Sequence, residues 1–199
     1  MKALFLFITS LLASTICNCQ VNISKKRTDT LLKILEKQKA QIDQYEFKHR
    51  EEITTLVQLS GRKALVKVKN DSYPDNTEYI YNVVKDSTGK VIAIEQIPYS
   101  ESGDWYEEFK HYFDANGKTL AFSKRETVFD DGVKTGVAVE DSFDYYDSSF
   151  SLLLHTTRLT DSNSKLLKGR KASEFDFRSD PYHEYKDSKS CIIAYKIKL

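Results

Sequence analysis

The chain has 199 residues, with 30 basic and 29 acidic residues, a formal net charge of +1 and 40% hydrophobic residues. A charge so close to zero excludes a broad electrostatic footprint for nucleic acid or for an anionic membrane surface. The length predicts a single domain that is large enough to bury its own hydrophobic core.

The first residues have the three-part pattern of a secretory signal peptide. Lys2 gives a positive start, residues 3–13 are mostly apolar, and small residues follow up to Cys19. The apolar run is too short to span a membrane as a helix, because a span needs about 20 residues. We therefore expect the protein to be exported, to the periplasm or outside the cell, and this segment to be removed.

Cys17 and Cys19 supply the small residues expected before a cleavage site, so we predict a signal peptide over residues 1–19 and one α+β domain over residues 20–199. The residues before each cysteine fit a bacterial lipid-attachment pattern poorly. A lipid anchor at either position is therefore the disfavoured alternative. No later run reaches transmembrane length.

Helical periodicity comes first along the mature chain and predicts one helix from Asp29 to Tyr45. Its apolar stripe consists of Leu31, Leu32, Leu35, Ile42 and Tyr45. The polar face carries both signs of charge, which favours packing on a larger element over binding to a membrane surface.

From residue 63 the hydrophobic period changes to two, which is typical of strands. The predicted strands cover residues 64–68, 79–84, 91–94, 105–113, 120–129, 137–146, 152–159 and 192–197. No second helical pattern separates them, so they must pair antiparallel through short turns. We predict an α+β fold, with one N-terminal helix packed on a mostly antiparallel meander sheet of about seven or eight strands. Cys191, the only cysteine of the mature chain, cannot form an intrachain disulfide and is expected to be buried beside the last strand.

An internal repeat marks the turns. Residues 84–93 align with residues 112–121 and share Asp, Gly, Lys and Ala, while residues 146–149 and 186–194 give degraded copies. Each copy predicts a strand, a tight turn and a strand. The stretch from Asp114 also looks like the start of a calcium loop, but it lacks the closing Glu of such loops, so we interpret it as a hairpin turn.

The unit Tyr112–Lys118 resembles the Tyr-Asp-x-x-Gly hairpin of YD-type repeat proteins. The layout from Asp29 to Leu159 resembles uncharacterised exported proteins of Gram-negative bacteria that have one helix and an antiparallel meander with such turns. This resemblance implies a fold and an exported location, and it transfers no functional residue.

Motifs for nucleophilic catalysis, zinc, phosphate loops and dinucleotides are all missing from the sequence. We therefore predict no catalytic residue, no metal ligand and no cofactor. A hydrolase that uses paired carboxylates stays open as a less favoured alternative. Its candidate carboxylates are Glu107, Glu108, Glu126, Glu140, Asp141 and Asp144.

Aromatic residues give the remaining functional signal. Trp105, Phe109 and Phe113 are predicted to share one face of a strand, and Tyr106 and Tyr112 the other. Such a sheet could bind an apolar or sugar ligand, and the candidate ligand-binding residues are Trp105, Tyr106, Phe109 and Tyr112. Core packing and ordinary surface tyrosines are the plain structural alternative.

Residues 160–190 are predicted to form an irregular loop with at most one short helix near residues 164–167. Its basic residues are Lys165, Lys168, Arg170 and Lys171, which either form a solvated surface or contact an acidic partner. We predict a non-enzymatic periplasmic or envelope-associated binding or interaction module, whose partner is an unknown protein or an apolar or sugar ligand. A carrier of an apolar ligand, with a lipoprotein-carrier-like architecture and Trp105, Phe109 and Leu152 lining its cavity, is the main alternative.

Overall fold

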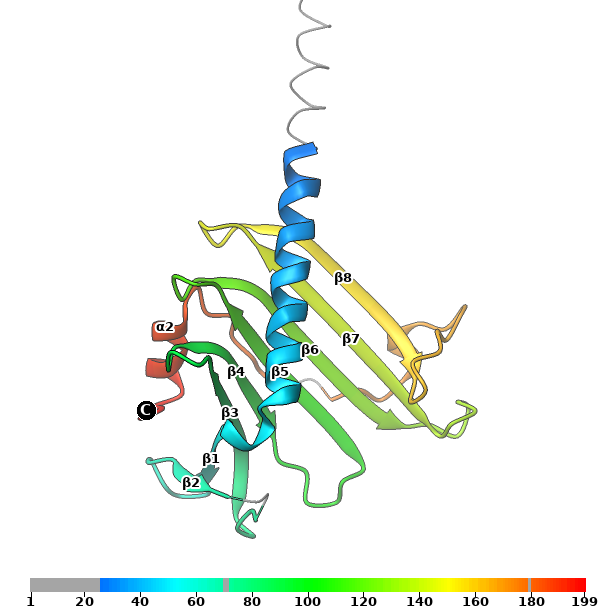
Figure 1. The fold of residues 1–199 in the computed structure, drawn as a ribbon. Coiled ribbons are helices and arrows are strands. Elements are labelled where there is room, and N and C mark those ends of the chain that lie inside the picture. Colours follow the sequence, from blue (N-terminus) through cyan, green and yellow to red (C-terminus); the bar gives the residue numbers. More distant parts are fainter. Residues whose placement is uncertain (1–25, 70–71, 179) are drawn as a thin grey trace, which may run out of the picture.

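The computed structural model describes residues 26–69, 72–178 and 180–199 (Figure 1). The predicted signal peptide, with Cys17 and Cys19, lies outside these residues. In the part of the chain that is described, no helix is long and apolar enough to cross a membrane.

A single antiparallel sheet of eight strands forms the centre of the molecule. Its strands are β1 (Thr54–Leu59), β2 (Val66–Val68), β3 (Thr77–Lys85), β4 (Val91–Pro98), β5 (Trp105–Phe113), β6 (Thr119–Phe129), β7 (Val137–Tyr146) and β8 (Leu152–Asp161). Their spatial order is β2-β1-β3-β4-β5-β6-β7-β8, so β3 to β8 form a continuous meander. The predicted α+β class and antiparallel sheet are confirmed.

The long N-terminal helix occupies residues 26–48 and crosses one face of the sheet (Figure 1). Leu35 and Ile42 are buried in a cluster that contains Ala121 of β6 and Tyr145 of β7. The helix extends beyond the predicted bounds of 29–45, and the short 3-10 helix η1 (Arg50–Glu52) connects it to β1.

The C-terminal segment covers the opposite face of the sheet. Its helix α2 (Ser188–Ala194) contributes Cys191 to a core cluster that includes Val83, Ile94 and Phe113. The predicted strand over residues 192–197 is therefore wrong, although Cys191 is buried as expected. Strands β3 to β5, on which α2 packs, are already paired on both sides, so a further strand would find no free edge there.

Three of the hairpins, β3–β4, β5–β6 and β7–β8, share one turn device. The Asp114 carboxylate accepts hydrogen bonds from the backbone N–H of Asn116 and Lys118 at 2.7 and 2.8 Å, and Gly117 takes a φ of +74°. The hairpin-turn interpretation of this stretch is thus confirmed. The same pattern of backbone N–H bonds two and four residues on recurs at Asp86, Asp147 and Asp161.

The remaining differences concern short elements. The first strand, β1, was not predicted from the sequence. The degraded repeat copy at residues 186–194 is not a hairpin, because Asp187 accepts a hydrogen bond from the backbone N–H of Ser190 and caps α2. The irregular segment contains one short helix, but it is the 3-10 helix η2 (Ala172–Glu174) and lies after residues 164–167, where the sequence allowed one.

Candidate functional site

The four predicted ligand-binding aromatics lie on opposite faces of β5. Trp105 and Phe109 face the C-terminal segment, where the Arg178 guanidinium lies 4.1 Å from the Trp105 ring centroid and Tyr182 stacks on Phe109 at 5.0 Å. Tyr106 and Tyr112 face the N-terminal helix. The structure confirms that Trp105 and Phe109 lie on one face of β5 and that Tyr106 and Tyr112 lie on the other. The four residues therefore do not form one site.

Tyr112 belongs to the packing under the helix, and Tyr106 lies on the same face of β5. The Tyr106 hydroxyl donates to the Glu108 carboxylate at 2.5 Å, and the Lys39 ammonium lies 4.7 Å from the Tyr112 ring centroid. Tyr112 is 3% exposed. Its ring therefore serves the helix–sheet interface rather than an open surface.

A charged cluster lies beside these tyrosines, between the helix and β4–β5. The Lys110 ammonium contacts the carboxylates of Glu46 and Glu95, the latter at 2.7 Å. Burial, reinforced by the charge of Glu95, raises the pKa of Glu46 to about 7. Burial acts to raise the pKa of Glu95, but the charge of Lys110 and the hydrogen bonds from Lys110, Glu46 and Asn82 together lower it.

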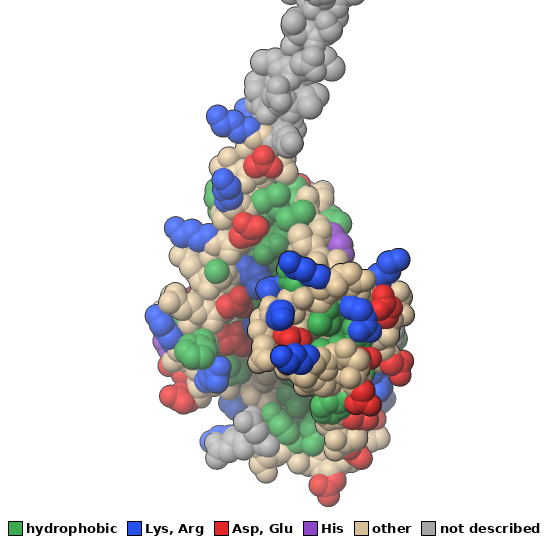
Figure 2. Space-filling view, turned by 90° about the vertical axis from the view of Figure 1, so that its right-hand side faces the viewer, with side chains coloured by type: hydrophobic (Ala, Val, Ile, Leu, Met, Phe, Trp, Pro, Cys, Tyr) green, Lys and Arg blue, Asp and Glu red, His purple; other side chains and the backbone are tan. Residues whose placement is uncertain are grey.

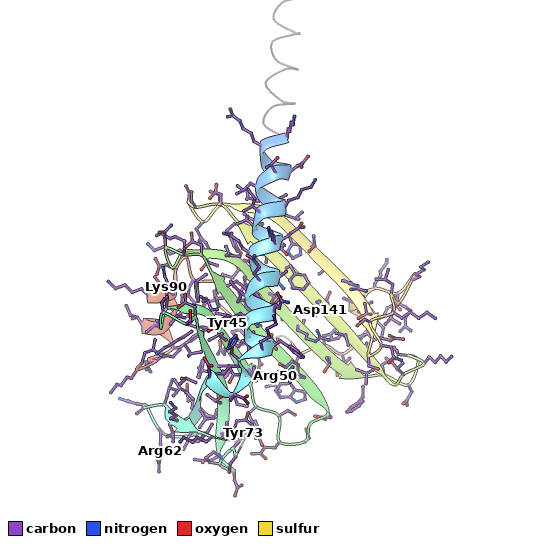
Figure 3. All side chains as sticks on the ribbon, viewed as in Figure 1. Tyr45, Arg50, Arg62, Tyr73, Lys90 and Asp141 are labelled. Carbon is purple, nitrogen blue, oxygen red and sulfur yellow. The ribbon has the colours of Figure 1, made fainter. Side chains whose placement is uncertain are left out.

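The hydrogen bonds of this cluster continue across the sheet. Glu95 accepts from the Asn82 side-chain amide at 3.1 Å, and Asn82 accepts from the Thr55 hydroxyl at 2.9 Å. Asp141 pairs with Arg125 at 3.3 Å, and Figure 3 shows Asp141 beside the helix on the side away from Tyr45. The contacts of Lys110 with Glu46 of the helix and Glu95 of β4 fix the helix on the sheet, which accounts for these buried charges without a ligand.

A carboxylate pair occupies the opposite face. Glu107 and Glu126 are direct cross-strand neighbours and are 0% and 4% exposed. The Lys124 ammonium lies 3.4 Å from Glu107 and 2.9 Å from Glu126. Neither oxygen of Glu107 has a hydrogen-bond partner among the described residues. Burial is the main reason that the pKa of Glu107 rises to about 7, and the charge of Glu126 adds to it.

This pair is the closest approach to the hydrolase alternative, since two carboxylates face each other as a glycosidase needs. Phe109 packs beside it, and Tyr182 stacks over Phe109 and Phe122 with its ring 5.5 Å from the Lys124 ammonium. Both carboxyl groups are therefore packed inside the protein rather than presented to solvent.

Another polar site lies at one end of the sheet, in loops, and is open to solvent. A hollow of about 480 Å³ opens there between the β6–β7 hairpin and residues 161–170. Four basic residues line it, and we call them the basic end: Lys134, Lys165, Lys168 and Arg170. Figure 2 looks onto this end of the molecule and shows several Lys and Arg side chains on it.

Charge is only partly balanced at the basic end. Arg170 pairs with Glu174 at 2.5 Å and lies over the Phe175 ring. Lys134, Lys165 and Lys168 are exposed and have no ion pair among the described residues. An anionic group at the hollow would thus lie near three lysines without an ion pair among the described residues, and the Asp161 carboxylate, which also lines the hollow and accepts two backbone hydrogen bonds, offsets only part of their charge.

Three members of the basic end were noted from the sequence, and Lys134 was missed. It belongs to the turn between β6 and β7, and in an up-and-down meander that turn lies at the same end as the end of β8. The predicted strand order therefore already contained the signal. Lys171, which was noted with the others, is exposed and precedes η2.

Comparison with known proteins adds no assignment: no family model, no curated protein and no solved structure matches this chain.

Proposed function

We propose that this protein is an exported, non-enzymatic interaction module that binds an acidic partner protein through its basic end. The observation that carries the proposal is that Lys134, Lys165 and Lys168 surround one hollow and form no ion pair with any residue that the structure describes. Carboxylate side chains of a partner would complement this charge, and such complementarity raises association rates and selects partners.

The other two functions find less support. Phe109, expected to line a carrier cavity, is 1% exposed and covered by Tyr182, whereas Leu152 is 56% exposed on β8. The carboxylate pair of Glu107 and Glu126 is buried together with Phe109. The basic end is the candidate that a macromolecule can reach without displacing packed side chains.

Binding of a fluorescein-labelled hexaglutamate peptide, measured by anisotropy, tests the proposal. A variant with Lys134, Lys165 and Lys168 changed to Gln should bind at least about tenfold more weakly at low ionic strength. The matched control changes the exposed helix residues Lys33, Lys37 and Lys48 to Gln, removes the same charge and should retain binding.

Equal weakening in the two variants would mean that only net charge matters and would refute the proposed site. Tighter binding of a single-stranded oligonucleotide with the same number of charges would refute an acidic protein as the partner class. Export is tested separately, by the intact mass of the protein recovered from the periplasm. A mass that retains Lys2 would contradict removal of residues 1–19, and acyl chains on Cys17 or Cys19 would establish the lipid anchor.

A further inference from the structure

Strand β8 forms a long edge of the sheet. The opposite edge, β2, has three residues, whereas β8 has ten. Residues 155–158 of β8 are exposed, and no proline or inward-facing lysine interrupts the strand. Natural proteins usually protect such an edge, because its outward backbone groups can pair with another strand.

Hydrogen bonds at the end of β8 show which backbone groups point outward. The carbonyl of Leu159 accepts from the N–H of Leu167 at 3.1 Å, and the N–H of Asp161 donates to the carbonyl of Lys165 at 2.9 Å. Odd-numbered residues here therefore turn their N–H and C=O groups away from β7. The same alternation directs the backbone groups of His155 and Thr157 outward, and no hydrogen bond of the described residues reaches them.

The chain itself begins to add a strand at this edge. Leu166 forms an antiparallel bridge with Thr160, and the pairing stops there. The segment that makes this bridge also carries Lys165 and Lys168 of the basic end. The open part of the edge is thus directly followed by the basic hollow.

We infer that β8 accepts an extended acidic segment of a partner protein as a ninth strand, paired with His155 and Thr157. The acidic side chains of this segment reach the basic end, so the inference rests on the proposed function and specifies how the partner binds. Backbone hydrogen bonds then supply affinity that is independent of sequence, as in other proteins that bind peptides by strand addition. The lysines select for acidic residues.

Two synthetic peptides separate pairing from charge. One reads four Glu residues followed by Thr-Val-Thr-Val, so that antiparallel pairing with β8 places the Glu residues at the basic end. The other has Pro in place of each Val, which keeps the charge but removes alternate N–H donors. Binding of the first peptide to the full-length protein should slow amide hydrogen exchange at His155 and Thr157 at least about tenfold. The amide of Thr156, which points toward β7, serves as the internal reference.

Variants of β8 supply the matched control. The unchanged protein should bind the Val peptide about tenfold more tightly than the Pro peptide. The Thr157→Pro change removes an outward N–H and no sheet hydrogen bond, so it should abolish this preference. The Thr157→Val change keeps the backbone donor and should retain that preference. The exchange measurement on the unchanged protein decides the question even where the proline variant folds poorly.

The outcomes distinguish the two proposals. Equal binding of both peptides, lost when the three lysines are changed and without protection of His155 or Thr157, would overturn strand addition and leave the charge-based function standing. No binding of either peptide would overturn both. A dimer that forms through β8 in sedimentation experiments, and that Thr157→Pro dissolves, would show that the occupant is a second copy and would overturn the acidic partner segment.

Discussion

Replacing Glu107 by Gln should raise the free energy of unfolding more at pH 8 than at pH 5. The pKa of Glu107 is raised to about 7 in the folded protein, mainly by burial, against an ordinary value of 4.5 that the unfolded chain should show. Between these two values the folded state holds a proton that the unfolded state has lost. Stability therefore falls as the pH rises from about 4.5 to about 7.

The magnitude follows from the same two pKa values. Each pKa unit corresponds to about 1.4 kcal/mol, so ionised Glu107 costs at most about 3 kcal/mol above pH 7. At pH 5 the Glu107 carboxyl is mostly ionised in the unfolded chain but still protonated in the folded protein. Part of this loss of stability is therefore already present at pH 5. Relative to the parent, the Glu107→Gln variant should therefore gain about 2 kcal/mol more in free energy of unfolding at pH 8 than at pH 5.

Urea unfolding at the two pH values, followed by the fluorescence of the single tryptophan, Trp105, measures this difference. The raised pKa values of Glu46 and Glu184 also make stability fall with pH, but they cancel when variant and parent are compared. The exposed residue Glu101, changed to Gln, is the matched control and should show no pH-dependent difference. An identical effect of the Glu107 change at both pH values would mean that Lys124 already keeps Glu107 ionised, and the argument would be wrong.

Three further changes probe other parts of the fold. Lys110→Met leaves the buried carboxylates of the helix interface without their shared cation and should cost about 3–5 kcal/mol in urea unfolding, so a loss below about 1 kcal/mol would contradict the cluster's role. Gly117→Ala should destabilise the protein more than Gly89→Ala in the same assay. Both glycines have a positive φ, but only at Gly117 would the new Cβ meet another residue, the Ser188 hydroxyl at 2.9 Å. Equal effects of the two changes would contradict this close contact. Cys191 is buried and its pKa is raised by that burial, so peptide mapping after treatment with a thiol reagent at pH 8 should find it unmodified until the protein unfolds, and rapid labelling would show an open α2 contact.

Local patterns in the sequence predicted the sheet well. The alternation of apolar and polar residues predicted the bounds of β5 and β7 to the residue. The two Asp-x-x-Gly turns were also predicted correctly, and their glycines, Gly89 and Gly117, have a positive φ. The turn after Asp161 was missed because Ser164 occupies its positive φ position, without the usual glycine. Turn chemistry is thus easiest to predict where glycine occupies the positive φ position, whereas the Asp147 turn, with Phe150 in that position, was found only as a degraded copy of the repeat.

The cover of the face opposite the N-terminal helix could not be predicted, because it depends on a distant C-terminal segment. Residues around Ile192 and Ile193 are strong β-formers, yet they form a helix because the strands that they pack against have no free edge. The irregular segment over residues 175–187 has no periodic pattern, so nothing in the sequence indicated that Tyr182 covers Phe109. The candidate site in the loops could therefore be predicted from the order of the strands and the positions of the charges, whereas the packing of the aromatic residues could not.

The sheet of this protein depends on cover from both sides, which leads to one more prediction. Val83, Ile94 and Phe113 are at most 2% exposed beneath Cys191 and Ile197 of the C-terminal segment. Deleting residues 188–199 would expose these three side chains to water, at a cost of about 1.5–3 kcal/mol each. Their summed cost approaches the whole net stability of a typical domain, about 5–15 kcal/mol. The shortened chain should therefore lose its cooperative urea transition and bind a hydrophobic dye. Deleting only residues 198–199 should change little, since Leu199 is 57% exposed. If the longer deletion kept the parent's unfolding midpoint, the sheet would be stable with one covered face, and the C-terminal segment would be free to move as part of binding.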